Sequence, residues 1–385
     1  MMLRWKYLNC FLIFLMVLSC SNKAKNDADT PVSEAVNESA IEEPLGGEAI
    51  PVPSPVMVEY EGELLNIFFH PLVAKPEIAF KGKMRNHFLE WFVTADEYKK
   101  ILHELYIQDY VLVNISEIYE VTIENGKKKI IGKKPLVPEG KKPFILSVDD
   151  LNYYEEEREN GFVHKLVIDD KGNIAAWTAG GNGGEISYDL DVVTITEDFI
   201  KQHPDFSIRG AKGIIALTGY EGVLGWHTHI AYEGTGGRPT DKLNDPEYEE
   251  MVEKVTEVVN KLKQLGWVFA SHSWGHLNMP KAPMSWFTND TNRWDREVRP
   301  IVGDTDLYIY PFGATLEKHE DKHKILRDRG FVLFFGVGTG YGYRIKPGYM
   351  HLDRRNIDGS YLRGAQNLPN RLFDIDKVMD REMRK

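Results

Sequence analysis

Cysteine is nearly absent from this sequence. The chain has 385 residues and only two cysteines, Cys10 and Cys20, both within its first twenty residues. The remainder can therefore form neither a disulfide nor a thiolate metal site. Any metal bound there must be held by His, Asp or Glu.

An excess of basic residues is also missing. Lys and Arg number 47 against 58 Asp and Glu, a net charge of -11. Proteins that bind the nucleic-acid backbone carry a basic surplus, so we expect no nucleic-acid partner. The 42% of hydrophobic and 27% of charged residues exclude a wholly disordered chain and a polytopic membrane protein. No Gly-x-Ser-x-Gly motif is present, which disfavours a serine hydrolase.

The first 56 residues have the pattern of an export and anchoring segment. Residues 1–20 combine a basic start, an apolar run too short to span a bilayer, and Cys20 at the expected cleavage point. The ending Val17-Leu18-Ser19-Cys20 resembles the lipobox of bacterial lipoproteins, which predicts lipidation of Cys20 and an extracytoplasmic, membrane-anchored protein. An ordinary cleaved signal peptide is the alternative. Residues 21–56 lack aromatics and predict a disordered tether, followed by a catalytic domain over 57–385.

Apolar runs alternate with helical patterns through this domain. Thr94 and Glu97 form a capping box before a helix at 98–106, and helices are also predicted at 248–265 and 322–329. Strands are predicted at 64–69, 110–113, 143–148, 213–219, 267–271, 307–310 and 331–335. This alternation indicates an α/β fold with a largely parallel sheet or barrel. A long insertion is expected at about 151–245, with a glycine-rich loop at 170–186.

Polar side chains gather where several of these strands end. Asp149 and Asp150 follow one strand, and His272 and His276 follow another. Two histidines at i and i+4 can bind one metal if a helical turn joins them, and a carboxylate completes a site for zinc or a similar divalent ion. Asp150 supplies that carboxylate, and Asp149 is then placed to act as a base. The alternative is that the aspartates only begin a loop and the histidines are merely exposed.

These motifs resemble those of the polysaccharide deacetylases of the NodB-homology group, carbohydrate esterase family four. Ser147-Val148-Asp149-Asp150 resembles the first motif, Thr-Phe-Asp-Asp, and His272-Ser273-Trp274-Gly275-His276 fits the second, His-Ser/Thr-x-x-His. Ile309-Tyr310-Pro311-Phe312-Gly313 fits part of the third, Arg-x-Pro-Tyr-Gly. Phe69-His70-Pro71 is similar to the strand end that opens many members. The resemblance covers about 65–375 and implies a deformed (β/α) barrel.

The resemblance also implies roles for individual residues. Asp149 is the general base, and Asp150, His272 and His276 are the ligands of a divalent metal, expected to be zinc. Water attacks an acetamide carbonyl, and a backbone N–H near Phe312, after Pro311, helps to stabilise the oxyanion. Tyr349-Met350-His351 is the nearest match to the motif that carries the general acid, which makes His351 the candidate.

The sequence departs from the family pattern at two positions of the site. Ile309 replaces the arginine that contacts the catalytic base. Arg354 or Arg355 can compensate, and Arg355-Asn356-Ile357 resembles a late segment of members that lack that arginine, which favours Arg355. Leu151 replaces the usual glycine after the aspartate pair.

Other clusters are interpreted as structural. Aromatic residues in the insertion can stack on sugars, but we interpret them as packing; they are Tyr153, Tyr154, Trp177, Tyr220, Trp226 and Tyr232. His227 and His229 are assigned to a structured loop. The charged run His319, Glu320, Asp321 and His323 is assigned to a solvated helix face.

The sequence therefore predicts a metal-dependent deacetylase that hydrolyses amide bonds of an N-acetylated amino-sugar polymer, such as peptidoglycan or an exopolysaccharide, outside the cell membrane. Two alternatives stay open. One is an O-deacetylase acting on a cell-surface glycan. The other is an inactive, glycan-binding lipoprotein with the same fold.

Overall fold

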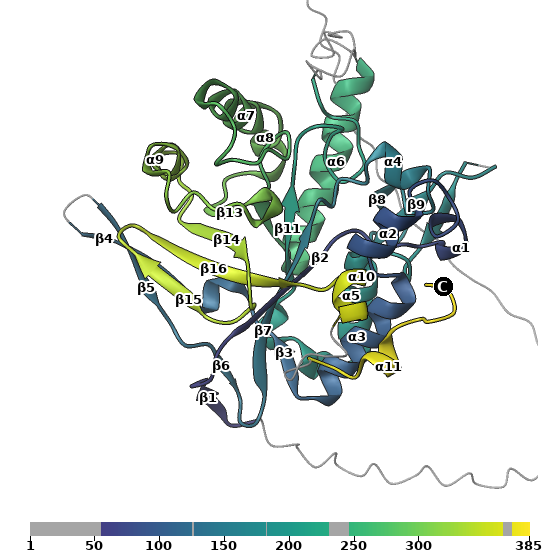
Figure 1. Ribbon diagram of the computed structural model, residues 1–385, viewed down its shortest axis with the longest axis horizontal. Coiled ribbons are helices and arrows are strands. Elements are labelled where there is room, and N and C mark those ends of the chain that lie inside the picture. The colour runs from purple at the N-terminus through teal and green to yellow at the C-terminus, as the bar shows by residue number, and fades with distance from the viewer. Residues whose placement is uncertain (1–54, 125–126, 182, 231–245, 365–371) are drawn as a thin grey trace, which may run out of the picture. The chain divides into compact units, whose positions relative to one another are not determined.

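A closed barrel of seven parallel strands forms the centre of the molecule (Figure 1). The computed structural model describes residues 55–124, 127–181, 183–230, 246–364 and 372–385. The barrel strands are β2 (Leu65–Phe69), β7 (Lys142–Asp149), β11 (Gly213–Leu217), β12 (Val268–Ser271), β13 (Leu307–Ile309), β14 (Leu333–Val337) and β16 (Tyr349–Asn356). They pair in the order β11-β12-β13-β14-β16-β2-β7, and β7 pairs again with β11 to close the barrel. The predicted (β/α) barrel is confirmed.

Both faces of these strands are buried, which explains their nearly continuous apolar runs. Side chains such as Ile145, Ile309 and Leu352 fill the interior of the barrel. Their neighbours in sequence, such as Leu146 and Val148, point outward and pack with the surrounding helices. Because successive side chains alternate, only every second residue of a strand faces the interior.

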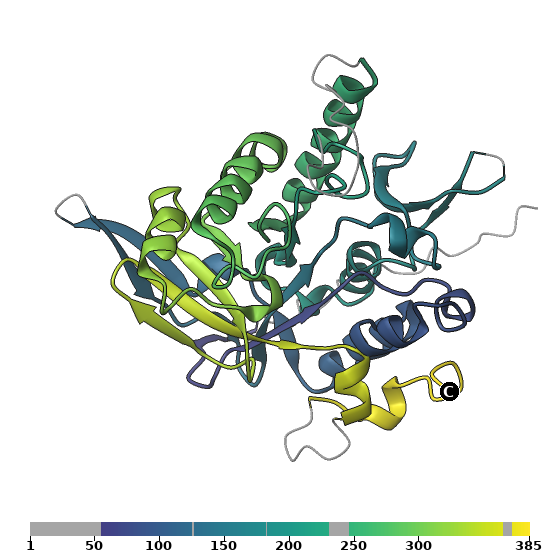
Figure 2. The same ribbon diagram turned by 45° about the horizontal axis from the view of Figure 1, so that its top comes forward.

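Helices surround the barrel. The predicted capping box is confirmed at the start of α3 (Ala95–Ile107), where the Glu97 N–H donates to Thr94 Oγ1 over 3.1 Å and the Thr94 N–H to Glu97 Oε2 over 2.9 Å. The other long helices are α5 (Val192–Gln202), α6 (Pro246–Leu265), α7 (Met284–Glu297) and α9 (Glu320–Asp328). The shorter ones are α1 (Pro76–Ala79), α2 (Arg85–Trp91), α4 (Glu155–Arg158), α8 (Arg299–Val302), α10 (Gly359–Gly364) and α11 (Ile375–Val378). In both views α10 and α11, in yellow, lie beside α2 and α3 (Figures 1 and 2).

Several smaller strands extend this framework. β3 (Tyr110–Leu112) joins the start of β7, and β15 (Tyr343–Lys346) pairs antiparallel with β16. β4 (Tyr119–Glu124) pairs antiparallel with β5 (Lys127–Gly132), and β1 (Met57–Glu59) pairs with β6 (Leu136–Pro138). No helix within the described ranges is both long and apolar enough to cross a membrane.

The predicted insertion at 151–245 needs correction. Residues 213–217 form β11, a strand of the barrel itself, because their apolar side chains fit between β7 and β12. The preceding segment contributes α4, α5 and a three-stranded antiparallel sheet of β8 (Lys165–Ile168), β9 (Ile174–Thr178) and β10 (Glu185–Ser187). The predicted loop at 170–186 is thus wrong in part, since β9 and the start of β10 lie within it.

Candidate metal centre and active site

All three predicted metal ligands meet above the carboxyl ends of β7 and β12. One ligand atom each from Asp150, His272 and His276 lies within 4.8 Å of the other two. Asp150 Oδ2 is 3.4 Å from His276 Nε2 and 3.8 Å from His272 Nε2. Two imidazoles and one carboxylate converging on one point suit zinc or a similar divalent ion and leave coordination positions open for water and substrate. The donor set therefore fits the implied metal.

Unusual backbone conformations create this convergence. Asp150, Ser273, His276 and Phe312 all have positive φ, between 51° and 60°. At Asp150 the left-handed turn at the end of β7 lets both aspartates face one cavity, although adjacent strand residues point apart. The helical turn expected between the two histidines is wrong. Residues 272–276 form a bent loop, and left-handed Ser273 and His276 bring the imidazole centroids to 5.0 Å.

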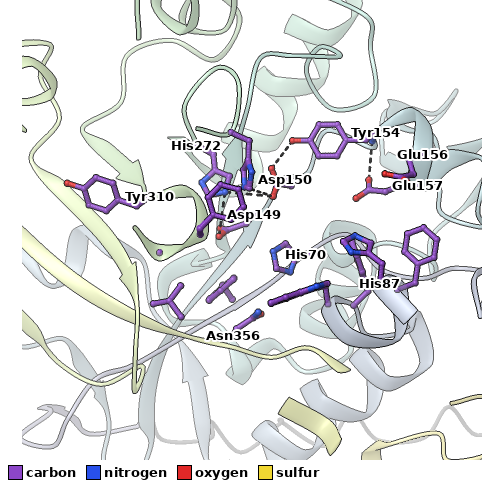
Figure 3. Close-up of a pocket in the computed structure, with 18 of the residues that line it drawn as sticks. His70, His87, Asp149, Asp150, Tyr154, Glu156, Glu157, His272, Tyr310 and Asn356 are labelled. Carbon is purple, nitrogen blue, oxygen red and sulfur yellow. Dashed lines mark hydrogen bonds and ion pairs between the residues drawn. The ribbon is translucent and has the colours of Figure 1, made fainter. Parts of the chain in front are cut away.

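A second layer of hydrogen bonds fixes the ligands. His272 Nδ1 donates to the carbonyl oxygen of Ile309 over 2.9 Å, which leaves Nε2 with its lone pair for a metal. The Tyr154 hydroxyl donates to Asp150 Oδ1 over 2.7 Å (Figure 3). On α7, Asp290 accepts the backbone N–H groups of Trp274 and Gly275, over 3.0 and 2.6 Å, and so holds the histidine loop.

The predicted base, Asp149, pairs with an arginine from β16. Arg354 donates from Nη1 to Asp149 Oδ1 over 2.6 Å and from Nη2 to Oδ2 over 2.8 Å. Arg354 thus supplies the guanidinium that Ile309 cannot. The choice of Arg355 was wrong, because adjacent strand residues face opposite sides: Arg354 points into the barrel, and Arg355 donates to Thr339 O on the other side.

Electrostatics keep both aspartates ionised. Burial alone raises the pKa of Asp149, but the Arg354 guanidinium and His272 outweigh it, so the pKa lies below its ordinary value. Burial likewise raises the pKa of Asp150, and His276, His272 and His70 bring it below the ordinary value. Asp149 Oδ2 is 4.0 Å from His272 Nε2, so an ionised carboxylate lies directly beside the metal position.

The prediction of His351 as general acid is wrong. Its side chain is fully buried and faces away from the barrel interior, with Nε2 3.1 Å from Asp353 Oδ1, and it does not line the cavity of the site. His70, at the end of β2, does line that cavity and lies below the two aspartates in Figure 3. His70 therefore replaces His351 as the candidate proton donor.

The site opens into a cavity of about 660 Å³. Phe312 lines it and is 67% exposed, and its ring centroid lies 4.4 Å from that of His276. The predicted Pro311 is buried and does not line the cavity. Eight aromatic side chains line the cavity: Phe68, Phe88, Trp91, Phe92, Tyr154, Tyr220, Tyr310 and Phe312. The sequence interpretation assigned Tyr154 and Tyr220 to packing, whereas they line the cavity and stack 4.7 Å apart. It missed the contribution of α2. The i, i+4 spacing of His87 and Trp91 was the available signal for a shared helix face.

The remaining candidates lie elsewhere. Tyr153 donates to Asp191 in the core, as the packing interpretation predicted, and His227 Nε2 lies 2.9 Å from Arg158 Nη1. His323 is not on a solvated helix face. Its ring is buried 4.3 Å from each of Phe334 and Tyr349. Cys20 and Tyr232 lie outside the described residues.

Comparison with known proteins agrees with the motifs. Residues 247–332 match the family model of polysaccharide deacetylase, a segment that includes His272, His276 and the third motif. No curated protein matches the sequence.

Solved structures to which this chain is similar include the following three proteins, compared by identity, coverage and TM-score. The deacetylase PplD of Streptococcus pyogenes, solved with acetate, is 15% identical, with 80% of this chain and 94% of that chain covered and a TM-score of 0.41. The polysaccharide deacetylase BC0361 of Bacillus cereus is 10% identical, with 77% and 65% covered and a TM-score of 0.40. IcaB of Ammonifex degensii is 14% identical, with 78% and 93% covered and a TM-score of 0.39. The similarity to polysaccharide deacetylases at the level of the family model thus extends over residues 247–332, which hold His272 and His276 but not Asp149 and Asp150.

Proposed function

We propose that this protein removes N-acetyl groups from an amino-sugar polymer outside the cell membrane, as a metal-dependent hydrolase. One observation carries the proposal. Asp149 is buried, paired with Arg354 and positioned beside the cluster of Asp150, His272 and His276. An ionised carboxylate next to a divalent-metal site is an arrangement suited to metal-assisted hydrolysis of an unactivated amide.

The chain's own residues divide the work. A divalent ion bound by Asp150, His272 and His276 supplies Lewis acidity toward water and the acetamide carbonyl. Asp149 accepts the proton of the attacking water, and Arg354 keeps that carboxylate ionised and oriented. Backbone N–H groups near Phe312 stabilise the developing oxyanion. His70 donates a proton to the departing amine, because it lines the cavity on the side of the two aspartates.

The metal and the location are further parts of the proposal. Zinc is the expected ion because two imidazoles and a carboxylate suit it. The signal-like start of the sequence and the lipobox-like ending at Cys20 support export, lipidation of Cys20 and anchoring to the cell membrane. The substrate is a glycan such as peptidoglycan or an exopolysaccharide.

Acetate release tests the activity. We expect the zinc-loaded protein to release acetate from N-acetylated oligosaccharides and Asp149→Asn to lower the rate by about 100-fold or more while the metal stays bound. O-acetylated substrates are assayed in parallel, and turnover of these alone would replace the proposal with an O-deacetylase. The inactive, glycan-binding alternative loses one of its supports, the missing arginine at Ile309, because Arg354 fills that role.

A paired experiment separates the two histidines. His70→Gln should strongly lower the rate of acetate release, and His351→Gln should leave it within about twofold, because only His70 lines the cavity. The reverse result would return the role of proton donor to His351.

A further inference from the structure

One end of the cavity, away from the metal ligands, has a distinct chemistry. α2 contributes His87 and Trp91, and α4 contributes Glu156. Figure 3 shows His87 and Glu156 on the side of the cavity opposite Tyr310, with His70 between His87 and the aspartates. The side chains of His87 and Trp91 lie on one face of α2 because they are four residues apart. This wall, made of His87, Trp91 and Glu156, is here called the α2–α4 wall.

Glu156 is the acidic residue of the cavity that belongs neither to the Asp149–Arg354 pair nor to the metal cluster and is not buried. Of the four acidic residues lining it, Asp149 pairs with Arg354 and Asp150 belongs to the metal cluster. Glu157 is buried, accepts the Tyr154 N–H over 3.0 Å, and has its pKa raised well above the usual range, first by burial and then by Asp150. Glu156 is exposed, and its carboxylate acts electrostatically on His87 across the wall.

The cavity also lacks positive side chains. Neither Lys nor Arg lines it among the described residues. A polymer that carries carboxylates or phosphates would therefore meet acidic side chains with no lysine or arginine to pair with. A neutral or cationic sugar is suited instead, and a carboxylate close to an aromatic face binds a sugar that bears an ammonium group.

The wall is held in place before any ligand arrives. Arg384 donates from Nη1 to Leu89 O over 3.0 Å and from Nη2 to Phe92 O over 2.8 Å, at the carboxyl end of α2. Arg363 donates to Leu89 O over 2.6 Å, and Arg384 pairs with Glu97 of α3 over 2.6 Å. Trp91 remains 43% exposed on this fixed helix. A rigid aromatic surface binds sugar with little loss of conformational entropy.

We infer that the α2–α4 wall is a subsite for a glucosamine unit with a free amine, so that the enzyme prefers polymer that is already partly deacetylated. This inference rests on the proposed function and specifies its substrate. Trp91 stacks on the sugar ring, and Glu156 pairs with the ammonium group next to the acetylated unit in the metal site. The product of one turnover then becomes the neighbouring group for the next.

Two tetrasaccharides test this preference, one fully acetylated and one with a single free amine. At about pH 6, where an aliphatic amine is protonated, we expect the zinc-loaded protein to turn over the amine-bearing tetramer with a kcat/KM about fivefold higher, the size of one exposed charge pair. Glu156→Gln should reduce this ratio to near one. The matched control Glu159→Gln, on the same short segment but outside the cavity, should keep it. Equal kcat/KM values in the unmutated protein, or an unchanged ratio in Glu156→Gln, would overturn the inference.

A binding measurement distinguishes failure of this inference from failure of the proposed function. The fully deacetylated glucosamine tetramer needs no turnover, and calorimetry measures its affinity directly. We expect binding that weakens several-fold in Glu156→Gln and in Trp91→Ala and that weakens with added salt, since an exposed pair is screened. If this pattern holds while no substrate releases acetate, the proposed function fails and the subsite stands. If acetate is released but the tetramer binds equally to Glu156→Gln and the unmutated protein, only the subsite is wrong.

Discussion

At the scale of single residues, the pair of Asp149 and Arg354 determines the state of the base. Both side chains are almost fully buried, with exposures of 4% and 2%. Removing one partner of such a pair leaves an uncompensated charge in the interior, which costs about 3–5 kcal/mol. The same pair therefore stabilises the fold and keeps the carboxylate available to accept a proton.

Substituting each of the two neighbouring arginines, Arg354 and Arg355, tests this pair directly. Arg354→Met should lower kcat for acetate release by about tenfold or more and reduce the unfolding free energy by roughly 3 kcal/mol, because Asp149 loses its partner. Arg354→Lys should lower kcat and the unfolding free energy less than Arg354→Met does, since lysine keeps the positive charge. Arg355→Met is the matched control and should change kcat by less than about twofold. A large loss with Arg355→Met and none with Arg354→Met would reverse the assignment.

His323 should make stability depend on pH. Burial against Phe334 and Tyr349 lowers its pKa from 6.5 to about 4, with smaller contributions from Arg327 and His351. The unfolded chain therefore binds a proton between pH 6.5 and 4 that the folded protein does not, and stability present above pH 6.5 is lost as the pH falls through this window. The loss is on the order of 3 kcal/mol.

Urea unfolding at several pH values measures this effect. His323→Phe should remove most of the difference between pH 6.5 and pH 4, since Phe has no proton to bind. The exposed histidine of α3 offers a control, and His103→Gln should keep the pH dependence of the unmutated protein. A pH dependence that is the same in both variants would assign the effect to other groups.

At the scale of elements, α7 acts on the metal site without contributing a ligand. Asp290 accepts two backbone N–H groups of the loop that carries His272 and His276. We predict that Asp290→Ala weakens zinc binding by about 10- to 100-fold, as the loss of an outer-shell partner does elsewhere. Competition with a chromogenic chelator measures this. Asp295, also on α7, pairs with Arg299 and Arg329 instead. Asp295→Ala is therefore the control and should leave zinc affinity unchanged.

The elements also show where sequence patterns were informative. β7 and β12 were predicted because each is an apolar run that ends abruptly in polar residues, and the metal ligands follow directly. β16 was not predicted because Asp353, Arg354 and Arg355 interrupt its apolar pattern. Because β16 was not predicted, the sequence could not show whether Arg354 or Arg355 faces the barrel interior. It also could not show that His351 faces outward. The contribution of α2 to the cavity depends on contacts with Arg363 and Arg384, far along the chain.

At the scale of the whole molecule, the metal should join parts of the barrel that are distant in sequence. Asp150 follows β7, whereas His272 and His276 follow β12. An ion bound at 100 times its dissociation constant adds about 2.7 kcal/mol to stability. We therefore expect a chelator to lower the melting temperature by roughly 5 °C or more. The double variant His272→Ala/His276→Ala should melt at the same temperature with and without chelator, and a chelator effect of equal size there would place the stabilising ion elsewhere.

The pairing of β16 with β2 sets the order in which the candidate site becomes complete. β2 is the first strand of the barrel along the chain and β16 the last, and they lie side by side. During synthesis the barrel therefore stays open, and Asp149 lacks the Arg354 guanidinium, until the chain has emerged beyond β16. A chain that stops before Arg354 contains Asp149, Asp150, His272 and His276 but no closed barrel to hold them. Termination or proteolysis before residue 354 should thus yield protein in which the candidate site is incomplete.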